Sequence, residues 1–99
     1  MAARVNKTSL AESDIAEAIT YLLEQNPGAA GKFVSDLQGM VRRLSHFPEL
    51  YPLQRRSSKA EWQNVRMAVL RRFGHIIFYT YEKNTLIIRR VIHGTRNEP

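Results

Sequence analysis

The apolar residues in the first half of the chain recur every three or four positions, which is the spacing of an amphipathic helix. The pattern is interrupted once, at Asn26 and Pro27. Asparagine is a good N-cap and proline fits the first helical position, so these residues indicate the start of a second helix. The recurring apolar positions are Ala11, Ile15, Ala18, Ile19, Leu22, Ala30, Phe33, Val34, Leu37, Met40, Val41 and Leu44. Because almost no linker separates the two segments, the pattern predicts an antiparallel helical hairpin over about residues 9–46.

The segments on either side of this hairpin carry weaker signals. Ser9, followed three residues later by Glu12, predicts a capping box with Ser9 as the N-cap of the first helix. Residues 4–8 predict a short first strand. Residues 46–62 contain two prolines and show no clear period, so we expect a long loop there. The basic residues of this loop are Arg55, Arg56 and Lys59.

The second half of the chain changes to the residue types and the period of two that are typical of strands. Three segments rich in β-branched and aromatic side chains follow one another, separated by turn signals at Gly74 and Asn84. They predict a three-stranded antiparallel meander over about residues 63–93. The order of elements is strand, helix, helix and three strands. It predicts a single α+β domain over residues 1–99, with the helical hairpin packed on one face of a small antiparallel sheet.

The charge of the chain is strongly positive and unevenly distributed. The formal net charge is +6, and arginine supplies 11 of the 15 basic residues. Residues 1–38 carry a net charge of −2, whereas residues 39–99 carry +8. The planar guanidinium group suits phosphate and carboxylate, so we expect an anionic partner, either a nucleic acid or an acidic protein segment.

Several classes of site are not indicated by the sequence. Cysteine is absent, which excludes disulfides and thiolate ligands. The three histidines lack the spacing of a metal site, and there is no phosphate-binding glycine loop or nucleophile elbow. We therefore expect neither a metal nor a cofactor. No apolar run is long enough to span a bilayer, and the N-terminal residues lack the apolar core of a signal peptide, so a cytoplasmic protein without membrane contact is expected.

Six arginines in and beside the predicted meander form a candidate binding surface. They cannot all be buried, because an unpaired buried charge is costly, so we expect several to gather on or beside the open face of the sheet. Aromatic side chains interleaved with basic ones are typical of surfaces that bind single-stranded nucleic acid. A surface for an acidic protein would have the same composition. The candidate residues are Arg66, Arg71, Arg72, Arg89, Arg90 and Arg96, with Tyr79, Tyr81, His75 and His93.

His93 is the strongest single candidate for catalysis. Imidazole groups ordinarily gain or lose a proton near physiological pH. A histidine at this position could therefore act as the general acid or base of RNA cleavage. Arg66, Arg72 or Arg96 could then stabilise the charge that develops on the phosphate. The alternative is that His93, which Gly94 follows, only forms a hydrogen bond at the end of the chain. The sequence offers no second convincing acid or base, which slightly favours the alternative.

The order and spacing of several motifs together resemble the RelE/ParE superfamily of bacterial toxins. The resemblance extends over about residues 5–97. Its motifs are "SLAESDIAEAITYLLEQNPGAAGKFVSDL", "LSHFPELYP" and "NVRMAVLRRFGHIIFYTYEKNTLIIRRVIHGTRN". The resemblance implies a toxin with a helical hairpin on an antiparallel sheet, held inactive by a cognate antitoxin. Operator DNA would be bound only through that antitoxin.

The resemblance leaves the target of the toxin open. ParE-like members poison DNA gyrase, whereas RelE-like members cut messenger RNA on the ribosome with the help of several lysines. This chain has only four lysines, and its ending "RRVIHGTRN" looks closer to the ParE-like branch. A gyrase inhibitor is therefore the first interpretation, with an mRNA endonuclease or an inactive antitoxin-binding relative as alternatives. The residues implied for binding the target or antitoxin are Arg71, Arg89, Arg90, Arg96, Tyr79 and Tyr81. The residues implied for a nuclease are His93, Arg66 and Arg72.

Overall fold

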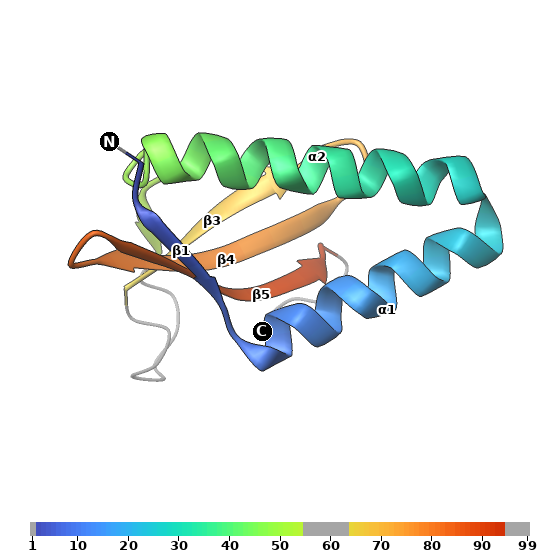
Figure 1. Ribbon diagram of the computed structural model, residues 1–99, viewed down its shortest axis with the longest axis horizontal. Helices are drawn as coiled ribbons and strands as arrows, with labels where there is room; N and C mark the ends of the chain where they lie inside the picture. The colour runs from blue at the N-terminus through green and yellow to red at the C-terminus, as the bar shows by residue number, and fades with distance from the viewer. Residues whose placement is uncertain (1, 55–63, 95–99) are drawn as a thin grey trace.

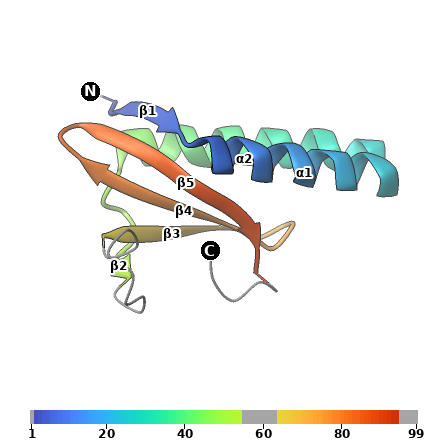
Figure 2. The ribbon, with the colours of Figure 1, turned by 90° about the horizontal axis from the view of Figure 1, so that it is seen from below.

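The computed structural model describes residues 2–54 and 64–94, which form two helices and five strands. The elements are β1 (Arg4–Lys7), α1 (Ser9–Gln25), α2 (Pro27–His46), β2 (Leu53–Gln54), β3 (Val65–Leu70), β4 (His75–Glu82) and β5 (Thr85–His93). The helices form a hairpin that lies on one side of the twisted sheet (Figure 1; Figure 2). The predicted α+β architecture and the helical hairpin are therefore confirmed.

The sheet has the strand order β1-β5-β4-β3-β2 and is mixed, because β1 pairs parallel to β5. The predicted antiparallel meander of β3, β4 and β5 is confirmed. The prediction of a structureless loop over 46–62 was wrong in part, because Leu53 and Gln54 pair antiparallel with the start of β3. A strand of two residues next to a proline is too short to show a period. Three basic residues predicted in this loop lie outside the described residues, namely Arg55, Arg56 and Lys59.

The two hairpin turns of the meander use the residues that the sequence indicated. Lys83 and Asn84 connect β4 to β5, with φ angles of 52° and 59°. Positive φ at both central residues is typical of a type I′ turn, whose twist matches that of the flanking strands. Gly74, with φ of 74°, ends the connection between β3 and β4. The two turns fix the registers in which β3 pairs with β4 and β4 pairs with β5. These registers decide which side chains face the helices.

The start of α1 differs from the prediction, because Thr8 rather than Ser9 is the N-cap. The Thr8 hydroxyl accepts a hydrogen bond from the Ala11 amide at 3.0 Å and donates one to the Arg89 carbonyl at 2.9 Å. Its amide also donates to the Ile88 carbonyl at 3.0 Å. Thr8 therefore ends the β1–β5 pairing and begins α1. At α2 the prediction is confirmed, since Asn26 accepts from the Gly28 amide at 3.0 Å.

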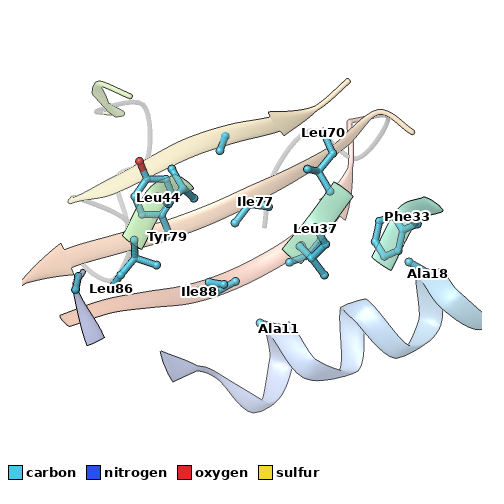
Figure 3. Close-up of a cluster of buried hydrophobic side chains, with 13 residues drawn as sticks. Ala11, Ala18, Phe33, Leu37, Leu44, Leu70, Ile77, Tyr79, Leu86 and Ile88 are labelled. Atoms are coloured by element: carbon cyan, nitrogen blue, oxygen red, sulfur yellow. The ribbon is translucent and has the colours of Figure 1, made fainter. Parts of the chain in front are cut away.

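The main core lies between the helical hairpin and one face of the sheet (Figure 3). The hairpin contributes large apolar side chains from α2, whereas the buried apolar residues of α1 are two alanines, which allow close approach to the sheet. Residues fully or almost fully buried in this core include Ala11, Ala18, Phe33, Leu37, Leu44, Ala68, Leu70, Ile77, Tyr79, Leu86, Ile88 and Val91. A second, smaller cluster contains Val65, Phe78 and Ile92. Side chains alternate along a strand, so this cluster lies on the opposite face.

Asp14 links α1 to the edge of β5 where β1 no longer covers it. The β1 strand pairs only with residues 85–88 of β5. Beyond them, the Asp14 carboxylate accepts a hydrogen bond from the Val91 amide at 3.0 Å. It also accepts from Nε and from a terminal nitrogen of Arg90, at 2.7 and 3.0 Å. Asp14 is only 7% exposed, and its hydrogen bonds raise the pKa of Arg90. The carboxylate thus satisfies both a buried backbone donor and a largely buried cation.

We predict that Asp14→Ala lowers the free energy of unfolding by about 3 kcal/mol, because it leaves a guanidinium and an amide without their acceptor. Urea denaturation followed by circular dichroism measures this loss. The matched control is Asp36→Ala, which removes the 3.1 Å ion pair with Arg72 at a more exposed position. That variant should lose less than about 1 kcal/mol. Equal losses in the two variants would contradict the role assigned to Asp14.

Candidate functional site

The structure does not gather the predicted arginines on one open face of the sheet. Two of them are paired with carboxylates of the helices: Arg90 with Asp14, and Arg72 with Asp36 at 3.1 Å. These carboxylates come from the acidic first half of the chain, which the fold brings against the basic second half. The prediction that the arginines gather on or beside the open face was therefore wrong for Arg90 and Arg72, whose charges are paired with carboxylates of the helices.

Arg66, at the start of β3, also binds partners within the domain. Its guanidinium donates a hydrogen bond to the Tyr51 carbonyl and lies 3.7 Å from the Glu49 carboxylate. The Arg66 side chain is only 13% exposed. Its contacts hold the segment between α2 and β2 against the sheet, so the structure gives Arg66 a structural position.

Two of the predicted arginines remain candidates for contact with a partner. Arg89 is partly buried on the open face of the sheet and donates a hydrogen bond to the Thr80 hydroxyl at 3.1 Å. Arg71 is exposed in the connection between β3 and β4, and forms no ion pair with the part of the chain that the structure describes. Arg96 lies outside the described residues. The available positive charge is thus concentrated at fewer positions than the sequence indicated.

The two candidate tyrosines lie on the core side of the sheet. Tyr79 has no exposed surface, and its hydroxyl donates to the Pro48 carbonyl at 3.1 Å. Burial raises the pKa of Tyr79. This placement contradicts a role for Tyr79 in surface contact with a partner. Tyr81 is partly buried and packs against the same core, so only part of its side chain is accessible to a partner.

A pocket of about 480 Å³ lies between α1, the start of β4 and the end of β5. Its walls are mostly apolar, and its polar groups are two acids of α1 and two histidines. The lining residues are Asp14, Glu17, Ala18, Tyr21, Leu22, Phe73, His75, Val91, Ile92 and His93. Asp14 is engaged by Arg90, which leaves Glu17 as the exposed acid of this pocket. Sequence reasoning missed this pocket because its walls come from segments far apart in the chain.

His93 lies at the edge of this pocket and packs against His75 and Gly74. The two imidazole rings meet edge to face, with centroids 5.3 Å apart. A Cβ atom on Gly74 would lie 3.1 Å from Nε2 of His93, so only glycine fits this turn without displacing the ring. The Gly94 amide donates to the Gly74 carbonyl at 2.8 Å. The end of β5 is therefore fixed against the β3–β4 connection.

The three residues proposed for a nuclease do not form one site. His93 pairs with His75 at one end of the meander, whereas Arg66 pairs with Tyr79 nearer the other end. Four residues along a strand separate these positions by about 13 Å. Arg72 is held by Asp36. The structure therefore separates Arg66 from His93, whereas Arg72 pairs with Asp36 and still has 55% of its side chain exposed.

Neither a metal site nor a membrane span is found in the described part of the chain. Residues 2–54 and 64–94 contain no group of three or more potential metal ligands from histidine, cysteine, aspartate and glutamate. Neither α1 nor α2 combines the length and apolar character that a bilayer crossing requires.

His75 should make the stability of the protein depend on pH. Burial, together with the neighbouring His93, lowers the pKa of His75, although the Phe73 backbone acts in the opposite direction. The unfolded chain therefore binds a proton near pH 6.5 that the folded protein binds only at lower pH. We predict that the free energy of unfolding falls as the pH decreases from 7.5 to 5.5. His75→Phe should reduce this fall, because it keeps an aromatic ring against Phe33. Urea denaturation at several pH values measures both curves, and parallel curves would contradict the prediction.

Comparisons with known proteins agree with the fold described above. The model of a family described as the ParE toxin of the type II toxin-antitoxin system, parDE, matches residues 5–98. No curated protein matches the chain. A solved structure, the chromosomal ParDE toxin-antitoxin system from P. aeruginosa, is similar with a TM-score of 0.74 and 18% identity. The alignment covers 92% of this chain and 95% of that chain, and at this identity it shows the fold alone. Since the family model spans nearly the whole sequence, this chain belongs to the ParE toxin family of type II toxin–antitoxin systems.

Proposed function

We propose that this ParE-family toxin inhibits DNA gyrase by direct protein contact and that a cognate antitoxin neutralises it. The antitoxin, rather than the toxin, would contact operator DNA. The observation that supports gyrase over mRNA as the target is the separation of His93 from Arg66 along the meander. A contact inhibitor needs no assembled acid, base and phosphate site. Gyrase acts in the bacterial cytoplasm, so the toxin is proposed to act there.

The proposed target contacts are Arg71, Arg89 and Arg96, and the two described ones, Arg71 and Arg89, form no ion pair with a described carboxylate. Arg71 is exposed beside the pocket residue Phe73, and Arg89 lies on the open face of the sheet. Arg96 follows β5 in the sequence and is proposed for the same contact. Charged residues at the edge of an interface mainly set the rate of association and the choice of partner.

The second candidate function is a ribosome-dependent mRNA endonuclease. The observation that favours it is the exposed His93 beside a second imidazole, since two such groups could share the transfer of protons. An inactive relative that only binds its antitoxin is the third candidate.

We predict that induced expression in bacteria causes filamentation and a DNA-damage response while translation continues. Purified toxin should inhibit supercoiling by gyrase. His93→Ala should keep this inhibition within about threefold of wild type, because no proton transfer is involved. Microscopy, amino-acid incorporation and a supercoiling assay measure these outcomes. Rapid arrest of translation that His93→Ala abolishes would instead establish the endonuclease.

We further predict that Arg71→Glu weakens gyrase inhibition by at least about fivefold, because it reverses a charge at the proposed contact. The matched control is Lys32→Glu, which reverses an exposed charge on α2. The control should stay within about twofold of wild type, since the change in net charge is the same but its position differs. Equal loss in both variants would show that net charge rather than the position of Arg71 matters.

A further inference from the structure

Residues 47–53, which run from the end of α2 to the first residue of β2, expose three large apolar side chains. Phe47 is 62% exposed, Leu50 45% and Leu53 37%. Scattered apolar residues are common on protein surfaces, but a contiguous group is typical of an interaction site. Phe47 and Leu50 are brought together by a turn in which the Leu50 amide donates to the Phe47 carbonyl at 3.1 Å. We call residues 47–53, with sequence FPELYPL, the 47–53 surface.

Side chains of the sheet hold the backbone of the 47–53 surface in place. The buried Tyr79 hydroxyl donates to the Pro48 carbonyl, and the Arg66 guanidinium donates to the Tyr51 carbonyl. The Tyr51 side chain packs against the main core. Buried polar groups of the sheet thus fix the backbone of a segment whose large apolar side chains face solvent. Fixing a binding segment before association lowers the entropy that binding costs, so the arrangement favours recognition of a partner.

The charge around the 47–53 surface is positive. Arg43 is exposed in the last turn of α2, four residues before Phe47 and therefore on the same side of the helix end. The nearby acid, Glu49, lies 3.7 Å from Arg66 and is therefore partly compensated. An apolar centre with a cationic border is complementary to a segment that carries large apolar side chains flanked by aspartate or glutamate.

We propose that the 47–53 surface binds the antitoxin, through an acidic segment whose apolar side chains cover Phe47, Leu50 and Leu53. This inference rests on the proposed function, in which the toxin has a cognate antitoxin. Long-lived protein complexes bury more apolar surface than transient ones, and an antitoxin must remain bound to its toxin. The surface adjoins β2, which pairs with the start of β3, whereas Arg71 follows the end of β3 (Figure 2). The antitoxin contact and Arg71 therefore lie toward opposite ends of this strand.

The test uses the full-length toxin and, as the probe, the protein encoded by the open reading frame adjacent to the toxin gene. Phe47→Ser combined with Leu50→Ser removes the apolar centre, and Arg43→Glu reverses the charge of its border. The matched control is Leu10→Ser combined with Leu23→Ser, which changes leucines that are 57% and 51% exposed on α1. Circular dichroism confirms that each variant is folded, and Phe47→Leu retains an apolar side chain as a rescue. Biolayer interferometry gives Kd, and growth after induction gives toxicity with and without the probe.

The expected result is that Phe47→Ser/Leu50→Ser raises Kd by at least about thirtyfold, as loss of a central apolar contact does in other interfaces. The toxin should remain toxic but no longer be neutralised. Arg43→Glu should raise Kd by at least about fivefold. The α1 control and Phe47→Leu should both stay within about threefold of wild type. A Kd for the folded double variant within threefold of wild type would overturn the inference while leaving the proposed function intact. A wild-type toxin that is neither toxic nor bound by the probe would overturn the proposed function itself.

Discussion

The fold depends on one buried carboxylate that joins its two layers. Asp14 on α1 binds the backbone of Val91 and the guanidinium of Arg90 at the edge of β5. Without it, this part of the strand would carry an unpaired donor beneath a helix, which is costly in a buried setting. The same contact fixes how far α1 lies from β5, and so it sets the width of the pocket that His93 borders. The buried contacts of Asp14 thus position the walls of the pocket that His93 borders.

The neutralisation of charge within the domain changes the interpretation of a strongly basic chain. Carboxylates of both helices pair with arginines of the second half of the chain, so two arginines join the helices to the meander. Arg90 and Arg72 are tied to helical carboxylates, and Arg66 holds the segment after α2. Composition therefore overstated the charge that is free to meet a partner. It did not indicate that the surface nearest Arg66 would be apolar.

Local signals predicted those parts of the fold whose determinants lie close together in sequence. Asn26 and Pro27 define the break between the helices by their own backbone preferences, and Asn84 defines a turn in the same way. The N-cap at Thr8 was missed because its hydroxyl is fixed partly by the Arg89 carbonyl, 81 residues away. The burial of Tyr79 was missed because β4 has apolar side chains on both faces and an irregular register between Phe78 and Tyr79. Partners of arginine cannot be assigned from sequence, since they depend on tertiary placement. One signal was present: Asp14 falls on the same helical face as Ala11 and Ala18, where a carboxylate requires a partner.

The parallel pairing of β1 with β5 has a consequence for the synthesis of the protein. β1 can join the sheet only after β5 has left the ribosome, because Arg4 pairs with Thr85. Contacts between residues so far apart in sequence form late in folding. The entropy of closing a long loop is lost before these contacts contribute any favourable free energy. A nascent or truncated chain that lacks β5 therefore has no closed sheet, no acceptor for Thr8 and no partner for Asp14. The order of translation itself delays the appearance of the complete sheet until β5 has been made.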